Sequence, residues 1–241
     1  MRRTSRRLLP PVGLVVGSVI GLGLLGSLAG CGGGSDEVDL TPAKVLALAE
    51  NHLDDTSGVD FSITSDDVPD GVVALTKADG ELTKAPAFKG SITVPISGVS
   101  ATVQVVSVDG TTYAKLPLVN SWQQIDPADF GVPDPATLLD PDTGIASLLK
   151  ATQSAKKGDS VRGGKDNKSI LTEYSGTLPG DDVATVLPGA AGEFDVTYTI
   201  DDDEMLSKAV ITGHFNGTDV AENTYTVTID EYGVDTEITK P

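Results

Sequence analysis

The sequence has very few of the residues that enzymes and metalloproteins use for chemistry. Its 241 residues include one cysteine, Cys31, and two histidines, His52 and His214. There is no Gly-x-Ser-x-Gly elbow, no phosphate-binding glycine loop and no His or Cys pair at metal-ligand spacing. One cysteine also excludes an internal disulfide, so the folded part must be held by its apolar core. These absences predict a protein that is not an enzyme and has neither a metal nor a cofactor.

Aromatic and basic residues are scarce as well. The chain has five Phe, five Tyr and one Trp, and Val, Ile, Leu and Thr dominate instead, which favours β-sheet. It has 17 basic and 35 acidic residues, for a net charge of −18. Four arginines lie within the first seven residues, so residues 31–241 carry 13 basic and 35 acidic side chains, or −22. Such a field repels nucleic acid and anionic bilayers, and a nucleic-acid partner is therefore excluded.

The N-terminal region has the layout of a bacterial export signal. The four arginines precede an apolar run over residues 12–25, and Leu28-Ala-Gly-Cys31 resembles a lipobox. In such signals the thiol receives a diacylglycerol, and cleavage makes the cysteine the first mature residue. We therefore predict a signal peptide over residues 1–30. Over residues 31–40 we predict a lipidated Cys31 and a flexible tether that holds the protein on the outer face of the cell membrane. An uncleaved transmembrane helix is the alternative.

Residues 41–241 are predicted to form one α+β domain. Thr41-Pro42 begins a helix whose apolar residues recur at helical spacing, and Gly58 ends it. From Phe61 onward apolar and polar residues alternate, which is typical of half-buried strands. The same pattern predicts later strands at residues 170–178, 194–200, 206–215, 223–229 and 234–238, with a short helix at residues 181–187 and an acidic hairpin turn, not a calcium loop, at residues 201–204.

A hairpin near the middle of the chain defines one apolar face of the predicted sheet. Asp109-Gly110 favours a two-residue turn, which pairs Val108 with Thr111. The register of this turn and the alternation along the preceding strands predict which side chains share the inner face. These side chains are Ile92, Val94, Ile96, Val103, Val105, Thr112, Ala114 and Leu116.

The segment between residues 126 and 155 is rich in proline, which restricts it to short helices. Pro135 begins about one helical turn. Asp142 or Thr143 caps a second helix, whose apolar stripe consists of Ile145, Leu148, Leu149 and Thr152. Residues 156–167 are predicted to be a polar loop, and it is our candidate for a flexible segment at the mouth of a binding site. Its basic residues, from Lys156 to Lys168, form either a cationic patch for a headgroup or a solvated surface.

Several of these segments together carry a family resemblance. Trp122-Gln-Gln-Ile-Asp126 is followed by Leu139-Asp-Pro-Asp-Thr-Gly144-Ile-Ala-Ser-Leu-Leu149, and the 108–113 hairpin and the terminal Ile238-Thr-Lys-Pro241 fit the same pattern. In this order they resemble the LppX/LprAFG lipoprotein family of actinobacteria over nearly all of residues 31–241. The resemblance implies a curved antiparallel sheet shaped like a half-barrel, with short helices on its concave face enclosing an apolar cavity. It also implies a protein that carries acylated lipids or glycolipids across the cell envelope, with a membrane exporter as a partner. We expect the protein to be a monomer.

The resemblance places Ile92 along the cavity wall, and an ordinary sheet residue facing a helix is the other interpretation of this position. The full set of predicted cavity residues is Ile92, Val94, Ile96, Val103, Val105, Ile145, Leu148 and Leu149. A filled core requires the same inward apolar residues, so the pattern alone leaves cavity and core open. Two functions follow: a lipid carrier, with neutral triacylglycerol among the candidate ligands because the chain is so acidic, or a surface lipoprotein of the same fold with a filled core. An enzyme acting on envelope lipids, a third hypothesis, would need one of the two histidines as its base.

Overall fold

The structure is a computed structural model that describes residues 40–69, 71–72, 74–96, 99–117, 119, 121–130, 132–164 and 167–241, without the side chain of residue 96. From residue 39 onward the chain forms one unit. The predicted signal peptide, most of the tether and Cys31 lie outside the described residues. Of the described helices, none is long and apolar enough to cross a membrane.

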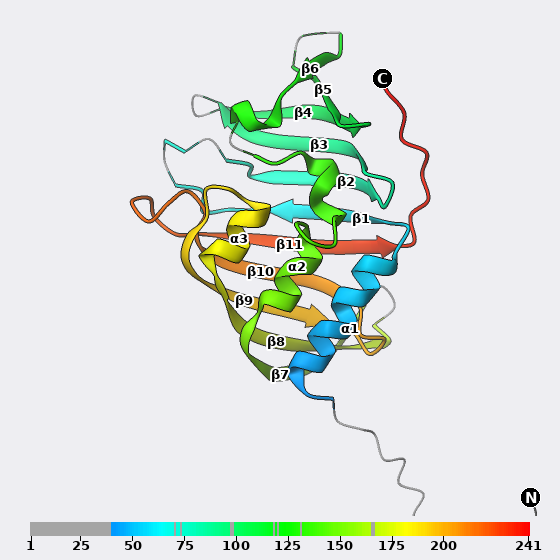
Figure 1. Ribbon diagram of the computed structural model, residues 1–241, viewed down its shortest axis with the longest axis vertical. Helices are drawn as coiled ribbons and strands as arrows, with labels where there is room; N and C mark the ends of the chain where they lie inside the picture. The colour runs from blue at the N-terminus through cyan, green and yellow to red at the C-terminus, as the bar shows by residue number, and fades with distance from the viewer. Residues whose placement is uncertain are drawn as a thin grey trace, which may run out of the picture. The chain divides into compact units, whose positions relative to one another are not determined.

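One antiparallel sheet runs through the described domain (Figure 1), in the strand order β6-β5-β4-β3-β2-β1-β11-β10-β9-β8-β7. It therefore consists of two meanders, β1–β6 and β7–β11, which are joined where β1 pairs with β11. The strands are β1 (Gly58–Thr64), β2 (Lys77–Thr83), β3 (Ala87–Ile96), β4 (Val99–Val108), β5 (Thr111–Lys115), β6 (Gln123–Ile125), β7 (Gln153–Gly163), β8 (Ser169–Pro179), β9 (Ala191–Ile200), β10 (Leu206–His214) and β11 (Asn223–Tyr232).

The helices lie on one face of this curved sheet (Figure 1). They are α1 (Pro42–Asp55), α2 (Ile145–Ala151), α3 (Gly180–Val186) and two 3₁₀ turns, η1 (Pro127–Phe130) and η2 (Pro135–Leu139). The three α-helices pack mainly over the β7–β11 meander, whereas η2 contacts β2, β3 and β4. The predicted α+β fold with its three helices and the single turn after Pro135 is confirmed.

The helix α1 begins as its sequence predicts, with Thr41 at the N-cap and Pro42 in the first turn. Its buried stripe consists of Val45, Leu46, Ala49 and Leu53. The start of α2 differs from the prediction. Asp140, not Asp142 or Thr143, organises the turn, because its carboxylate accepts hydrogen bonds from both of their backbone N–H groups and from the Thr143 hydroxyl, each at 3.0 Å. Gly144 then occupies the N-cap.

The β7–β11 meander and the α-helices enclose a densely packed core. Tyr198 is 1% exposed, and its hydroxyl lies 2.9 Å from the Thr152 hydroxyl and donates to the Leu148 carbonyl at 3.2 Å, which ties α2 to β9. Phe215 packs edge-on against Phe194 and Tyr225, with ring centroids 4.8 and 4.7 Å apart. The largest fully buried side chains in this half include Leu149, Leu178, Val183, Phe194, Tyr198, Ile200 and Leu206.

Two segments contradict the sequence-based predictions. Residues 156–167 are not a loop throughout, because β7 extends to Gly163 and pairs with β8, and this strand lies at the sheet edge farthest from β6. It therefore cannot be a mouth loop beside β1–β5. Residues 234–238 are not a strand. They form an irregular tail, in which Ile238 packs against Ala87, Val106 and Val108 beside Trp122. The strands β2 and β6 were not predicted.

The two predicted turns are confirmed. Val108 pairs with Thr111, and Asp109 and Gly110 both have positive φ angles, 53° and 65°, as a type I′ turn requires. In the acidic turn, the Asp201 carboxylate accepts from the backbone N–H groups of Asp203 and Met205 at 3.0 and 2.9 Å. The carboxylate is thus used by the turn itself, and the described residues contain no cluster of side chains arranged to hold a metal ion.

Candidate functional site

An apolar cavity of about 280 Å³ lies mainly between the β1–β6 meander and the segments that cover it, and it reaches β10 at Ile211 and β11 at Tyr225 and Val227. Only Thr112 and Tyr225 among the described lining residues carry a polar side-chain group, and none of these residues is charged. The wall comprises Phe61, Ile63, Ala74, Leu75, Ala78, Phe88, Ile92, Val94, Val103, Val105, Thr112, Ala114, Leu116, Ile125, Pro127, Phe130, Val132, Pro133, Pro135, Leu138, Ile145, Leu148, Val183, Val186, Leu187, Ile211, Phe215, Tyr225 and Val227. This is the environment of a hydrocarbon, and its volume lies just below the range of roughly 300–1,000 Å³ that is typical of small-molecule sites.

The structure places most of the predicted cavity residues on this wall. Those that line it are Ile92, Val94, Val103, Val105, Ile145 and Leu148. Leu149 does not line it; at 1% exposure it belongs to the packed core, because successive helical residues point about 100° apart. Residue 96 has no described side chain, and Cys31 lies outside the described residues.

The hairpin register supplies three further wall residues that the sequence had grouped correctly. Val105 pairs with Ala114, and Thr112 and Leu116 follow on the same face by the alternation of the strand. Other wall residues were not singled out, although the signal was present: Phe61 and Ile63 alternate on β1, as Tyr225 and Val227 do on β11. The wall residues between positions 127 and 138 have no such signal, because their segment is neither strand nor long helix.

A buried polar network holds the cover to the sheet. The Ser107 hydroxyl donates to the Asp134 carboxylate at 2.6 Å, and the Thr112 hydroxyl donates to Ser107 at 3.1 Å. The same carboxylate oxygen of Asp134 accepts from the Ala136 N–H at 3.0 Å and so begins η2. Because buried polar groups need partners, this network satisfies the hydroxyls of the concave face and leaves the cavity itself apolar.

One side of the cavity reaches the surface through apolar side chains. Leu116 and Phe130 line the cavity, yet they are 38% and 54% exposed. An open groove of about 720 Å³ adjoins this side and shares Thr112, Ile125, Pro127, Val132 and Pro133 with the cavity. The groove also contains Gln124, Asp126 and Asp134. An apolar chamber with a more polar entrance suits an amphiphile.

The cavity wall has no groups suited to catalysis among its described residues. Tyr225 is its one titratable side chain; burial raises the pKa of this residue, and its hydroxyl donates to the Leu75 carbonyl at 3.4 Å. His214 lies elsewhere, 2.8 Å from the Val220 carbonyl and 3.5 Å from the Glu222 carboxylate. His52 is exposed on α1. The site can bury hydrocarbon, and this is the chemistry that its geometry supports.

These features define a class: a one-sheet α+β fold that encloses an apolar cavity under short helices. Within that class, the chain belongs to the LppX_LprAFG lipoprotein family, whose sequence model matches residues 41–239. The match confirms the family resemblance of the motifs from Trp122 to Leu149 and at the C-terminus.

Curated relatives in this family have a named function. The lipoarabinomannan carrier protein LprG of Mycolicibacterium smegmatis is 27% identical over 229 residues, which cover 89% of this chain and 90% of that protein. LprG of Mycobacterium tuberculosis is 28% identical over 176 residues, or 70% of this chain and 69% of that protein. The name describes those proteins as carriers of lipoarabinomannan.

Solved structures show the same fold. LprF from Mycobacterium bovis superimposes with a TM-score of 0.65 at 16% identity, over 83% of this chain and 96% of that one. LppX from Mycobacterium tuberculosis gives a TM-score of 0.59 at 15% identity, over 82% of this chain and 98% of that one. The comparison confirms the predicted curved antiparallel sheet.

Proposed function

We propose that the protein is a lipid carrier, anchored through Cys31 to the outer face of the cell membrane, that holds acyl chains in its apolar cavity and moves their lipid across the envelope. The observation that supports this most directly is the wall of the cavity, which has two hydroxyls and no charge among its described residues. Each CH₂ transferred from water into such a site contributes about 0.8 kcal/mol. A cargo held in this way is shielded from water during transfer.

The adjoining groove supplies a place for the headgroup. Its polar side chains are acidic or neutral, with no lysine or arginine among its described lining residues. An anionic headgroup would therefore meet like charge, whereas hydroxyl-rich or ester headgroups find hydrogen-bond partners. This favours a glycolipid with an uncharged sugar, or a triacylglycerol, over a phosphorylated lipid. The lipoarabinomannan carriers among the relatives support a lipid with a sugar headgroup, and the acidic groove of this chain is a departure from the anionic, phosphorylated cargo of such carriers.

The alternative, a lipoprotein with a filled core, requires a different interior. Well-packed cores contain few voids larger than a water molecule. A chamber of about 280 Å³ is several times larger than that. The carrier proposal accounts for this open volume, and the filled-core proposal does not. An exporter that works with the carrier remains an expectation from the family resemblance.

The test is native mass spectrometry of the full chain, produced with its own export signal and purified from membranes in detergent. We expect an acylated species bound at about one per protein, in addition to the diacylglycerol on Cys31. Ile92→Trp should lose the bound species, because the indole fills the cavity. Ile170→Trp is the matched control, since Ile170 lies on β8 and is 37% exposed, away from the wall.

Lipid that is retained by Ile170→Trp and lost from Ile92→Trp supports the carrier. Equal retention in both variants would place the lipid elsewhere on the protein. A wild-type protein that stays free of lipid after incubation with envelope lipids would overturn the carrier and favour the filled-core lipoprotein. The mass of the N-terminal peptide reports the anchor independently of either result.

A further inference from the structure

The edge of the sheet farthest from β6 has an unusual charge. In β7 every residue except Ala155 and Gly163 is exposed. The strand carries three basic side chains, Lys156, Lys157 and Arg162, and one acidic side chain, Asp159. Lys44 in the first turn of α1, a helix that contacts β7, and Lys150 at the end of α2 are also exposed. We call Lys44, Lys150, Lys156, Lys157 and Arg162 the basic end.

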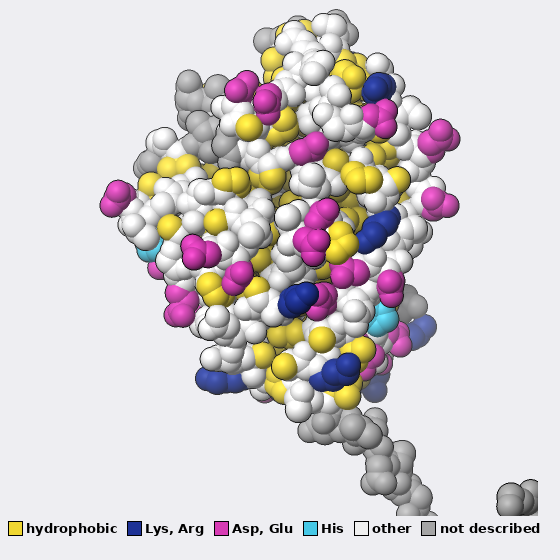
Figure 2. All heavy atoms as spheres, in the orientation of Figure 1, with side chains coloured by type: hydrophobic (Ala, Val, Ile, Leu, Met, Phe, Trp, Pro, Cys, Tyr) yellow, Lys and Arg dark blue, Asp and Glu magenta, His cyan; other side chains and the backbone are white. Residues whose placement is uncertain are grey.

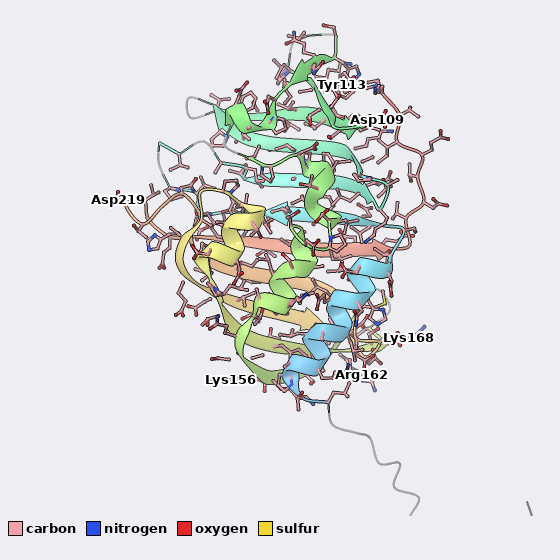
Figure 3. The ribbon with its side chains drawn as sticks, viewed as in Figure 1. Asp109, Tyr113, Lys156, Arg162, Lys168 and Asp219 are labelled. Atoms are coloured by element: carbon pink, nitrogen blue, oxygen red, sulfur yellow. The ribbon has the colours of Figure 1, made fainter. Side chains whose placement is uncertain are left out.

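The basic end contrasts with the rest of the molecule. It holds five of the 13 basic residues of a region whose net charge is −22. Figure 2 shows most dark-blue side chains of this face toward the end where α1 begins, with magenta ones spread over the remainder. Figure 3 shows Lys156 and Arg162 along this edge, near the start of α1. Within the basic end, the ammonium of Lys150 lies 3.9 Å from the Glu50 carboxylate. Further acidic groups lie one strand further in, at Glu173 of β8 and at the 201–204 turn, where Asp202 accepts from the Ile170 N–H at 3.2 Å.

An exposed apolar residue lies within the same strand. Val161 is 59% exposed, between Ser160 and Arg162. Basic residues on an edge strand discourage pairing with another chain, which is one reason to find them there. Basic side chains around an exposed apolar group are also the composition of surfaces that lie on anionic lipid, where the charges meet headgroups and the apolar group enters the interface.

The length of chain before α1 decides between these roles. Nine residues, 31–39, connect the proposed lipid anchor to Leu40, and a chain of that length spans at most about 30 Å. The domain is thus confined near the bilayer, where even weak contacts are populated because the effective concentration is high. Because residues 31–241 carry a net charge of −22, an anionic membrane repels the domain wherever it does not present a basic face. Since α1 begins beside β7, the tether presents that face to the membrane.

We propose that the basic end is a docking surface for the anionic face of the phospholipid bilayer. This inference rests on the lipid anchor of the proposed function. Docking sets the orientation of the carrier: β3, on the cavity wall, lies seven strand positions from β7, up to about 34 Å along the sheet. The cavity mouth then faces away from the membrane, where a soluble acceptor can reach it.

Fluorescence of a single labelled cysteine tests the orientation. In the lipidated protein the thiol of Cys31 is blocked, so Val161→Cys introduces the one free thiol for an environment-sensitive dye. Val99→Cys is the matched control, because Val99 is also an exposed strand valine, 70% exposed, but lies on β4. Both are reconstituted through their anchors into vesicles of phosphatidylcholine alone or with one third phosphatidylglycerol. We expect a blue shift for the Val161 label in the anionic vesicles only, which high salt removes.

Charge reversal then identifies the surface. We combine Lys156→Glu and Lys157→Glu in one variant. Its ratio of docked to undocked protein should fall by about fivefold for each positive charge removed. Lys77→Glu with Lys89→Glu changes the total charge equally on β2 and β3, both exposed positions, and should leave the shift in place.

The outcomes separate this inference from the anchor on which it rests. Anchored protein with no shift at Val161, or with equal shifts at Val161 and Val99, overturns the docking surface alone. A Val161 shift that follows protein density and not vesicle charge also overturns it, and indicates pairing of β7 edges between two copies. Protein recovered without the diacylglycerol mass overturns the anchor and the docking together.

Discussion

The two meanders of the sheet carry similar apolar side chains, yet the β7–β11 half, called the packed half, is densely filled, whereas the β1–β6 half, called the open half, supplies most of the sheet residues of the cavity wall. Over β7–β11, side chains such as Leu178, Phe194 and Leu206 are at 0% exposure. Over β1–β6, Ile92 and Val103 are only partly buried and line a cavity of about 280 Å³. The sheet faces alone do not explain this difference, because both alternate apolar and polar residues in the same way.

The cover explains it. The packed half lies under three α-helices, each of which presents two or more buried apolar residues. The open half is covered between residues 126 and 139 by the single turns η1 and η2, in which Pro127 and Pro135 occupy the first positions. Proline limits such a segment to short helical pieces. A single helical turn has no continuous stripe of apolar side chains that could fill the concave side of the sheet. The cavity is therefore a consequence of a proline-rich cover.

The largest contrast should come from the same truncation in each half. Leu178→Ala removes a fully buried side chain and should lower the free energy of unfolding by about 2–5 kcal/mol. Leu138→Ala acts at a half-buried residue that already borders empty space, so the added cavity term is small and we expect a loss of about 1 kcal/mol. Urea unfolding measures both. Equal losses would mean that the two halves are packed alike.

Enlarging a side chain should give the same ranking, with the packed half again the less tolerant of the change. Val196→Phe has no room in β9, where Val196 is 2% exposed, and should cost about 1–3 kcal/mol of stability. Val103→Phe enters the cavity and should leave stability nearly unchanged while it reduces the amount of copurifying lipid. Thermal unfolding and lipid extraction provide the measurements. A strongly destabilised Val103→Phe protein would argue against an open chamber at this position.

The inward-facing residues of β3 to β5 were predicted well from the sequence, and the reason is local. Asp109-Gly110 sets the hairpin register over one turn, so the facing of Val105, Ala114 and Leu116 follows without tertiary information. The apolar alternation of β3 extends the same face by one strand. Such signals involve only a few neighbouring residues, so they do not depend on how the rest of the protein packs.

The failures concern structure that depends on a distant partner. The strand β7 contains Lys156-Lys157-Gly158-Asp159-Ser160, which has no apolar alternation, and it is a strand because it pairs with β8. Ile238 is buried, yet the alternation around it does not make a strand, since the tail lies against side chains of β3 and β4 and pairs with neither. The volume left under a proline-rich cover depends on how that cover sits, and no residue pattern encodes it.

The junction between the two covers should be sensitive to one methyl group. A Cβ at Gly144 would clash with the backbone carbonyls of Leu138 and Asp140, where η2 passes into α2. Backbone cannot move aside as a side chain can, so Gly144→Ala should cost about 1–3 kcal/mol. Gly158→Ala on β7 is the control, because its Cβ meets only ordinary contacts, and we expect a change within about 0.5 kcal/mol. Similar midpoints in urea for the two variants would contradict this account of the junction.

The smallest effect is expected at the same junction, from pH. The hydrogen bond from the Thr143 hydroxyl, with those from the backbone N–H groups of Asp142 and Thr143, holds the pKa of Asp140 below its ordinary value of 3.8. Because the pKa of Asp140 is lower in the folded state than in the unfolded state, its carboxylate stabilises the fold. This stabilisation is complete at pH values above the ordinary pKa and is lost as the pH falls through the folded-state pKa. Thr143→Val should move the pKa of Asp140 back toward 3.8 and so reduce the stabilisation that this carboxylate contributes above that value and loses in acid.

Asp60 in β1 provides the internal reference, because its pKa is shifted in the other direction. Burial, with the charges of Asp230, Glu81 and Glu231, raises the pKa of Asp60, so protonation of this group favours the folded state and its contribution falls as the pH rises through the raised value. Titration of the carboxyl carbons by NMR in the wild type and in Thr143→Val separates the two residues. The Asp140 titration should move and that of Asp60 should not. If the titrations of Asp140 and Asp60 both move, the junction and the sheet respond to acid as one unit. That result would contradict the distinction between a locally held cover and a rigid sheet.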